Sequence, residues 1–126
     1  MWWTIAGVIG ALGVALGAFG AHSLDGHVDE HLIEVWHTAS RYHLIHALAL
    51  LGVAAHPRKP AVVGALFVVG IALFAGSLYL MPVLTLALGG SWRWLGAITP
   101  LGGVAFIAGW VSLAVWPRTP KSASSS

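Results

Sequence analysis

The sequence predicts an all-α fold, an integral membrane four-helix bundle with both termini in the cytoplasm. Charged residues make up only 8% of the 126 residues and hydrophobic residues 58%, whereas about a quarter of an average soluble domain is charged. Four apolar stretches each approach the roughly 20 residues that a helix needs to cross the hydrocarbon core. A chain so poor in charge cannot coat a water-facing surface, so we expect the lipid bilayer to be its main partner.

The composition also narrows the classes of function. The chain has no cysteine, which excludes disulfides, thiolate metal sites and cysteine nucleophiles. Six Lys and Arg residues against four acids are too few to argue for a nucleic-acid partner. The length suits one domain. We expect a single four-span membrane domain over residues 1–116 and a disordered polar tail over residues 117–126.

The first two spans are predicted on either side of a polar segment. Trp2–Ala21 carries no formal charge and is long enough to span the bilayer. No Lys or Arg precedes it, so we expect a retained helix and not a signal peptide. The polar segment covers residues 24–41 and overlaps the start of the second span. That span is expected to begin near Trp36, an interfacial anchor, and to end before the 56–60 loop.

The third span is predicted over Ala61–Leu80. Two prolines in the preceding loop, His56–Pro60, end one helix and favour the start of the next. Pro82 is expected to close the span, because proline breaks helices. Leu84–Gly90 is then an apolar connection that we expect to lie in the membrane interface.

The fourth span is predicted to end at Trp116. It follows Ser91–Trp94, where two tryptophans flank one arginine, a pattern typical of a membrane boundary. Thr99 and Pro100 have two interpretations. They are the N-cap and first residue of the main helix, or they mark a kink within it.

The distribution of charge predicts the orientation. With four spans, the N-terminus, the 56–60 loop and the tail share one side, which holds four cations and no acid. The other side holds two cations and all four acids. The positive-inside rule therefore predicts cytoplasmic termini and a short polar extracytoplasmic segment between the first and second helices.

Glycines recur at helical spacing in the apolar stretches. In the first span they share one face and include a GxxxG pair: Gly10, Gly13, Gly17 and Gly20. Further glycines stand in the third and fourth spans: Gly64, Gly70, Gly76, Gly96, Gly102, Gly103 and Gly109. Small residues let helix backbones approach closely in lipid. We expect close packing within the bundle, with a homo-oligomer interface as the alternative.

The polar segment is the candidate functional region. Six of the seven histidines and all four carboxylates lie between residues 22 and 46, and ionisable groups are costly in lipid. Asp25 or Asp29 is expected to cap a helix. Two pairs have metal-ligand spacing if that helix covers residues 27–41: His27 with His31, and Glu34 with His37. A di-iron site needs a second such motif, so we favour a solvated amphipathic face lying on the membrane.

Three histidines lie at the outer helix ends: His22, His43 and His46. An antiparallel hairpin would bring His22 within reach of the other two, and Tyr42 lies one turn from His46, where its phenol could contact the imidazole. One interpretation is that each imidazole hydrogen-bonds a backbone carbonyl or a helix end. The others are a proton relay, a transition-metal site or a haem ligand pair, the last without an attachment motif.

No nucleophile–base motif, P-loop or HExxH pattern is present in the sequence. Ser77 and Tyr79 in the third span are therefore interpreted as interhelical hydrogen-bond donors. A membrane-embedded hydrolase or oxidoreductase is the least favoured class, because all four carboxylates lie outside the predicted spans. No catalytic residue is assigned.

Four short motifs carry a resemblance to a known family: Gly17–His22 (GAFGAH), Tyr42–Leu50 (YHLIHALAL), Gly76–Tyr79 (GSLY) and Thr99–Gly103 (TPLGG). Over residues 5–116 the chain resembles the small four-span membrane proteins of domain-of-unknown-function family 423, which includes transmembrane protein 256 of animals. The resemblance implies a multi-pass protein of the bacterial inner membrane and implies no particular reaction. Seven residues fall on family motif positions: His22, Tyr42, His46, Ser77, Tyr79, Thr99 and Pro100. His43 departs from the pattern, which usually has Gln there, and His27, His31 and His37 lie in a variable connection.

Two hypotheses follow. The first is a non-enzymatic accessory or organising membrane component, for which no cofactor is predicted. The alternative is a metal- or proton-handling membrane protein that uses His22 and His46, with Tyr42 and His43 as further candidates. A transition metal belongs to this alternative only.

Overall fold

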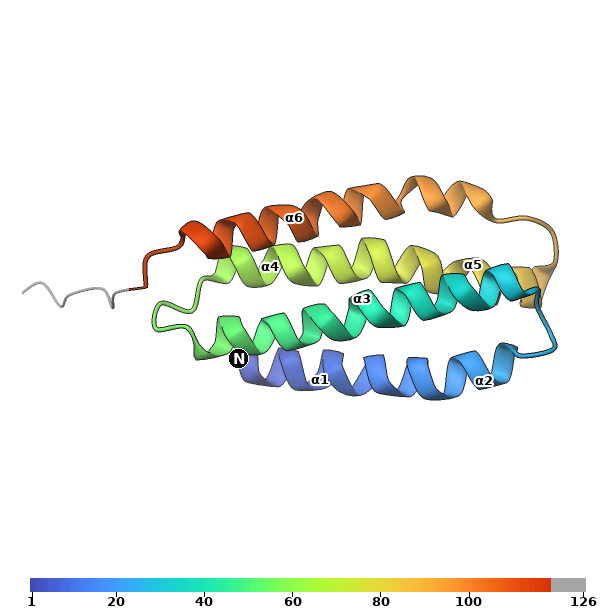
Figure 1. Ribbon diagram of the computed structural model, residues 1–126, viewed down its shortest axis with the longest axis horizontal. Helices are drawn as coiled ribbons and strands as arrows, with labels where there is room; N and C mark the ends of the chain where they lie inside the picture. Colours follow the sequence, from blue (N-terminus) through green and yellow to red (C-terminus); the bar gives the residue numbers. More distant parts are fainter. Residues whose placement is uncertain (119–126) are drawn as a thin grey trace, which may run out of the picture.

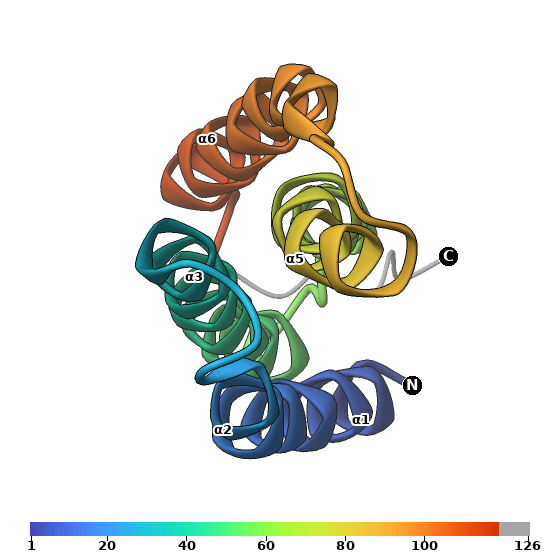
Figure 2. The same ribbon diagram turned by 90° about the vertical axis from the view of Figure 1, so that its right-hand side faces the viewer.

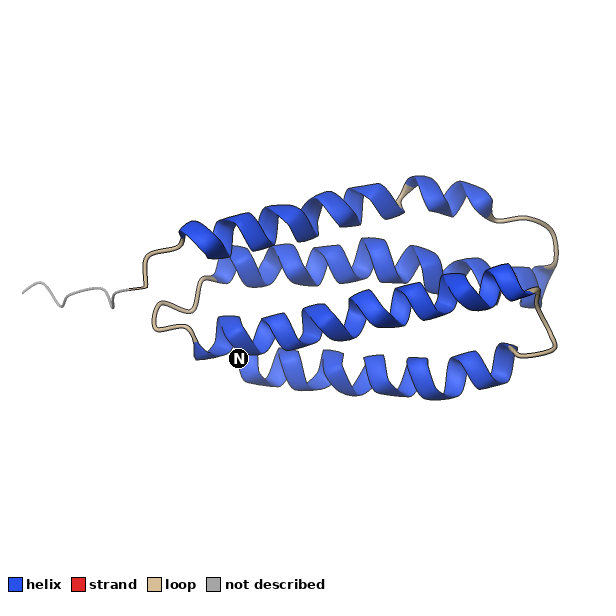
Figure 3. Cartoon of the chain, in the orientation of Figure 1, coloured by secondary structure: helices blue, strands red, loops and turns tan. Residues whose placement is uncertain are grey.

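The computed structural model describes residues 1–118 and is a bundle of four long antiparallel helices (Figure 1). The first helix joins α1 (Trp2–Ala15), a π-helical turn η1 (Leu16–Gly20) and α2 (Ala21–Leu24). The second is α3 (Glu30–Ala55), and the third joins α4 (Ala61–Gly70), a second π-helical turn η2 (Ile71–Ala75) and α5 (Gly76–Leu88). A 3₁₀ segment, η3 (Arg93–Ala97), precedes α6 (Thr99–Val115). The all-α prediction is confirmed, and the described part contains only helices and loops (Figure 3).

Three of the four helices are long and apolar enough to cross a membrane: Trp2–Leu24, Ala61–Leu88 and Arg93–Val115. The more polar α3 lies inside the bundle beside them. Seen from one end, α1–α2 and α6 lie at opposite edges, with α3 and α4–α5 between them (Figure 2). The central core is formed by α3 and α4, where Leu50, Val53, Val63 and Phe67 are fully buried.

The two ends of the bundle differ in their loops. The N-terminus, the 56–60 loop and the end of α6 lie together at one end, and the 25–29 and 89–92 connections lie at the other (Figure 1). The polar side chains between residues 25 and 37 are exposed at this second end: Asp25, His27, Asp29, Glu30, His31, Glu34 and His37. The predicted solvated face is therefore present. The tail prediction falls mainly on residues 119–126, outside the described part.

The second helix begins earlier than the sequence predicted. α3 starts at Glu30, and the Asp29 carboxylate caps it by accepting a hydrogen bond of 2.9 Å from the Leu32 amide. No proline interrupts α3, so its polar first half continues directly into the bundle. The solvated face is therefore the first part of α3 itself. The Trp36 side chain, expected as an interfacial anchor, is only 4% exposed and packs inside the bundle.

The third helix passes through Pro82 and ends at Leu88, so the predicted stop at Pro82 is wrong. Proline removes one amide donor from the helix, which is tolerated where neighbouring helices pack around it. Pro82 is fully buried, as that explanation requires. The predicted connection over Leu84–Gly90 is mostly helix. The chain turns only at Gly89 and Gly90, whose φ angles of 68° and 77° suit glycine.

The fourth helix resolves the two interpretations of Pro100. α6 begins at Thr99 with Pro100 in its first turn, where no amide donor is needed. Pro100 therefore starts the helix and does not kink it. Thr99 is already helical, and Ile98 is the N-cap residue.

Glycines place the helix backbones close together. Gly17 and Gly20 of the first helix face Ser40 and Trp36 of α3, and a Cβ atom at either glycine would collide with its partner. In the other half of the bundle Gly102 lies against the backbone of Phe74 in the same way. The predicted packing within the bundle is confirmed for these positions. Gly76 and Gly103 have room around them and are not tight contacts.

Candidate functional site

The described residues bury four polar side chains: Ser40, His43 and His46 on α3, and Ser77 on α5. The two histidines lie near the middle of α3, three residues apart, and are 5% and 4% exposed. Their rings point to different neighbours. His43 faces the first and third helices, and His46 faces α6.

The His43 imidazole bridges three helices. Its Nε2 lies 2.8 Å from the carbonyl oxygen of Ile9, and its Nδ1 lies 3.0 Å from the hydroxyl of Tyr79. A carbonyl oxygen can only accept, so Nε2 carries the proton. In a neutral imidazole Nδ1 then accepts from the Tyr79 hydroxyl. Burial with no carboxylate among its partners favours this neutral form of His43, in which both nitrogens are in use.

The His46 imidazole has the opposite tautomer. Its Nδ1 lies 2.7 Å from the carbonyl oxygen of Tyr42, to which it donates. Trp110 of α6 donates its indole N–H to Nε2 over 3.0 Å. Phe106 stacks on the imidazole at 3.5 Å between ring centroids and 10° between planes. His46 is thus also neutral, because an indole N–H can only donate.

This geometry limits the chemistry of both histidines. A metal ion needs an imidazole lone pair, and the lone pairs at His43 and His46 already accept hydrogen bonds from Tyr79 and Trp110. Protonation of His46 would turn its Nε2 into a donor facing the indole N–H of Trp110. The arrangement therefore suits joining helices. The interpretation that each imidazole bonds a backbone carbonyl is confirmed for His43 and His46.

The expected meeting of His22 with His43 and His46 does not occur. Ile9 of the first helix lies level with His43, and His22 is thirteen residues farther along, about 20 Å at 1.5 Å per residue. His22 is exposed at the end of the bundle that holds the 25–29 and 89–92 connections. A hairpin aligns helix ends, but His43 lies near the middle of α3. Within residues 1–118 no group of three or more His, Cys, Asp or Glu side chains is placed to hold a metal ion.

The two spaced pairs in the polar segment differ, because one is split between a loop and α3 and the other lies on α3. His27 lies in the loop before α3, because the helix begins only at Glu30. It therefore does not share a helical face with His31. Glu34 and His37 are on α3 but are exposed.

The remaining candidates hold helices together. The Ser77 hydroxyl donates to the Phe74 carbonyl over 2.9 Å, so it accepts from the Thr99 hydroxyl over 2.7 Å. Ser77 and Tyr79 thus both form interhelical hydrogen bonds, but Ser77 is the acceptor across the interface and not the predicted donor. The Tyr42 ring lies beside His46 as expected, with parallel planes and 6.2 Å between ring centroids, but the hydrogen bond to His46 uses the Tyr42 carbonyl and not its hydroxyl.

Sequence reasoning missed the two tryptophans that complete the site. Trp36 donates its indole N–H to the Leu16 carbonyl over 2.8 Å, at the start of the π-helical turn η1, and packs 4.6 Å from the Tyr79 ring. Trp110 supplies the donor for His46. The sequence pattern around Trp36 and Trp110 indicates only apolar or interfacial side chains. A buried imidazole needs hydrogen-bond partners, but this requirement does not identify which residue provides them.

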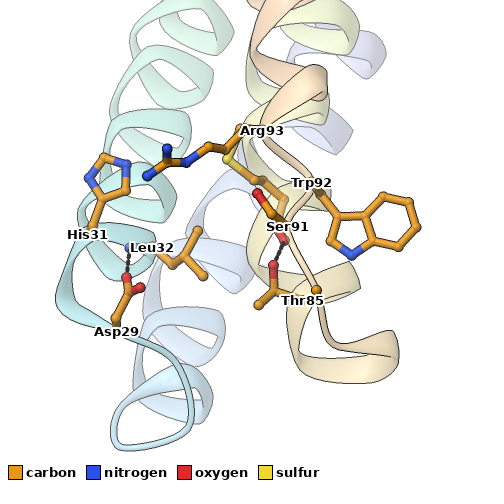
Figure 4. A pocket seen from close by; sticks show the side chains of 9 residues that line it. Asp29, His31, Leu32, Thr85, Ser91, Trp92 and Arg93 are labelled. Atoms are coloured by element: carbon orange, nitrogen blue, oxygen red, sulfur yellow. Dashed lines mark hydrogen bonds between the residues drawn. The ribbon is translucent and has the colours of Figure 1, made fainter.

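Several hollows open around the site. A groove of about 540 Å³ runs between α3 and α6. It is lined by Arg41, Tyr42, Ile45, His46, Phe74, Gly103, Phe106, Ile107 and Trp110. Another of about 390 Å³ lies between α1 and α3, and one of about 400 Å³ borders Ser77 and Tyr79. A hollow of about 400 Å³ lies at the end of the bundle that holds the 25–29 connection, between the start of α3 and the 85–93 segment. There His31 and Arg93 point toward each other from opposite walls (Figure 4).

Comparison with known proteins gives a consistent set of relatives. Residues 16–103 match the model of a family described as a protein of unknown function, DUF423. The chain is similar to the UPF0382 membrane protein YwdK of Bacillus subtilis, with 46% identity over 118 residues, covering 88% of this chain and 91% of the relative. A UPF0382 membrane protein of Schizosaccharomyces pombe is 39% identical, covering 90% and 98%. One of Staphylococcus aureus is 38% identical, covering 86% and 90%. No solved structure matches the chain.

Proposed function

This chain belongs to the DUF423 family of membrane proteins, and from that premise we propose that it is a non-enzymatic accessory or organising component of the bacterial plasma membrane. The observation that carries the proposal is the use of all four ring nitrogens of the two buried imidazoles in hydrogen bonds within the bundle. Buried polar groups of this kind hold transmembrane helices together.

The proposed topology has four spans with both termini in the cytoplasm. Three helices have the length and composition of spans, and α3 runs beside them through the bundle. The cations of the 56–60 loop and of the tail lie on the proposed cytoplasmic side, and every carboxylate lies on the other. The bacterial relatives support a plasma-membrane location.

Self-association is a further part of the proposal. The first helix packs on α3 through one face, and Val8 and Leu12 are exposed on another. Gly7 and Val14 lie at the edge of the contact and line a hollow beside α3, where Gly7 has nothing within 4 Å, so a second helix could approach closely there. An organising component would use such a face to contact another copy.

Cysteine labelling tests the topology, because the chain has no cysteine of its own. Ser91→Cys and Lys59→Cys place single thiols at exposed positions of the two ends. In intact spheroplasts we expect a membrane-impermeant maleimide to label Ser91→Cys only. Lys59→Cys should react only after permeabilisation. The reverse pattern would contradict the proposed orientation.

A double-mutant cycle tests whether the imidazoles act structurally. His46→Leu and Trp110→Phe, alone and together, should give a coupling free energy of about 0.6 kcal/mol, up to ~1.7 kcal/mol, the range for interhelical hydrogen bonds in membranes. The free energy of unfolding is measured in mixed micelles, with and without added zinc. A metal bound at one equivalent and lost in His46→Leu would favour the metal-handling alternative.

A further inference from the structure

We propose that the groove between α3 and α6 binds one anionic phospholipid, with the lipid phosphate at Arg41 and an acyl chain along the groove. The proposal rests on the four-span topology, which places this groove against the outer part of the bilayer. Its volume of about 540 Å³ lies within the ~300–1,000 Å³ typical of ligand sites.

The position of Arg41 is the first argument. It is the twelfth residue of α3, about 16 Å from the start of that helix at 1.5 Å per residue. The 3₁₀ segment with its boundary tryptophans begins α6 at the same end of the bundle. Arg41 therefore lies below the outer membrane boundary. A cation at that depth is costly unless it finds an anion or extends its side chain to the interface.

The chain offers Arg41 little to pair with. Residues 42–126 contain no Asp or Glu, so the helices beside the groove cannot supply a carboxylate. The nearest carboxylate on α3 is Glu34, two turns outward and about 10 Å along the helix. Within residues 1–118 Arg41 forms no ion pair. Its exposed guanidinium is free to bind a phosphate, which it can do with two parallel hydrogen bonds.

The groove below Arg41 suits an acyl chain. Ile45 and Ile107 line its opposite walls and are 46% and 65% exposed. Phe106 lines it between them. Two polar atoms beside the groove, His46 Nε2 and Trp110 Nε1, bond each other. The lining is thus cationic at Arg41, carries the hydroxyl of the neighbouring Tyr42, and is otherwise apolar or internally satisfied.

The charge of Arg41 selects among lipids. A zwitterionic phosphocholine carries its own cation beside the phosphate, whereas a phosphatidylglycerol headgroup has a net negative charge. One basic residue near an anionic surface strengthens binding about fivefold. We therefore expect about a fivefold preference for the anionic lipid.

Native mass spectrometry of the full chain in detergent tests this preference. Delipidated protein is mixed with equal amounts of phosphatidylglycerol and phosphatidylcholine that carry identical acyl chains. The ratio of the two lipids retained by the protein should be about five for the unchanged chain and close to one for Arg41→Gln. Arg41→Lys should keep most of the preference. Arg58→Gln removes the same charge at the opposite end and should leave the ratio unchanged.

A second pair of variants tests the acyl-chain part of the groove. Gly103 lines the groove, and a Cβ atom there would lie 3.9 Å from its nearest neighbour, Phe74 Cδ2. Gly103→Leu should therefore fill the groove without a clash and reduce binding of both lipids. Gly52→Leu makes the same change at an open position on α3 away from the groove, and it should have no effect.

The outcomes separate the lipid proposal from the topology. The lipid proposal is overturned if the unchanged protein retains both lipids equally. It is also overturned if the Arg41→Gln variant still prefers phosphatidylglycerol. Equal binding by Gly103→Leu and Gly52→Leu overturns the assignment of the groove. The cysteine-labelling result is independent of these ratios, so a failed topology and a failed lipid site are distinguishable.

Discussion

The two sides of α3 are built differently, although His43 and His46 are only three residues apart. On the His43 side, glycines of the first helix bring two backbones together, and Tyr79 closes the contact from α5. On the His46 side, α3 reaches α6 through side chains, and a groove remains open between them. A hollow of about 390 Å³ also opens on the first side, between α1 and the second half of α3, so only the stretch around His43 and Trp36 is closed. The comparison teaches that one polar helix can form a glycine-packed contact around one histidine and a side-chain contact beside an open groove around the next.

A large side chain placed in the contact between the first helix and α3 should cause the largest loss in the free energy of unfolding. Gly20→Leu places a side chain where the Trp36 indole lies, which costs about 1–3 kcal/mol for overpacking. It also displaces the indole donor of the Leu16 carbonyl, which costs about 1 kcal/mol more. Unfolding in mixed micelles measures the loss. Gly52→Leu, at an exposed position of α3 with nothing within 4 Å, is the control and should be neutral; equal losses would contradict the assignment of Gly20 to a closed contact.

Replacing each imidazole in turn should have the second-largest effect on the free energy of unfolding, and the effect should differ between the two sides of α3. His43→Leu leaves the Ile9 carbonyl without its side-chain donor and the Tyr79 hydroxyl without an acceptor, so we expect a loss of about 2–3 kcal/mol in the free energy of unfolding. His46→Leu frees only the Trp110 N–H beside an open groove, and about 1 kcal/mol is expected. A larger loss for His46→Leu than for His43→Leu would reverse the comparison.

The hydroxyl pair between α5 and α6 should contribute less. Thr99→Val removes the donor to Ser77 and keeps the side-chain shape, so we expect a loss of about 0.6 kcal/mol. Ser77→Ala also removes the bond to Phe74 within its own helix, and it should cost a similar amount. Thermal unfolding of each single variant and of the double variant measures the pair. Strictly additive losses would show that the two hydroxyls do not interact.

Adding or removing metal ions should have the smallest effect on the stability of the protein. The lone pairs of His43 and His46 accept hydrogen bonds from Tyr79 and Trp110, and His22 lies about 20 Å away along the first helix. Neither zinc nor a chelator should shift the thermal unfolding midpoint of the purified protein. A shift that disappears in a His22→Gln, His46→Gln double variant would contradict this expectation.

Composition and length were enough to predict the all-α membrane fold. The apolar stretches that begin at Trp2 and Ala61 start helices there, and Asp29 caps α3 as one of the two expected residues. Proline chemistry misled the prediction at Pro82, because the rule for soluble helices ignores the support of neighbours in a membrane bundle. The start of α3 was missed because polar residues have the same sequence pattern in a helix that lies on the membrane and in the exposed end of a bundle helix.

The site itself was only partly predictable. Buried imidazoles need partners, which predicted hydrogen bonds to backbone carbonyls at His43 and His46. Their other partners are Tyr79, 36 residues beyond His43, and Trp110, 64 residues beyond His46. No local pattern identifies contacts so distant in the sequence. The expected approach of His22 failed because helix ends were aligned without counting residues along each helix.

The most direct test of the structural role of the histidines is nitrogen-15 NMR of histidine-labelled protein in lipid bilayers. At neutral pH the account predicts two neutral imidazoles with opposite tautomers, His43 protonated at Nε2 and His46 protonated at Nδ1. His43→Gln and His46→Gln variants assign the two signals. A charged imidazolium at either position, or the same tautomer at both, would contradict the hydrogen bonds on which the account depends.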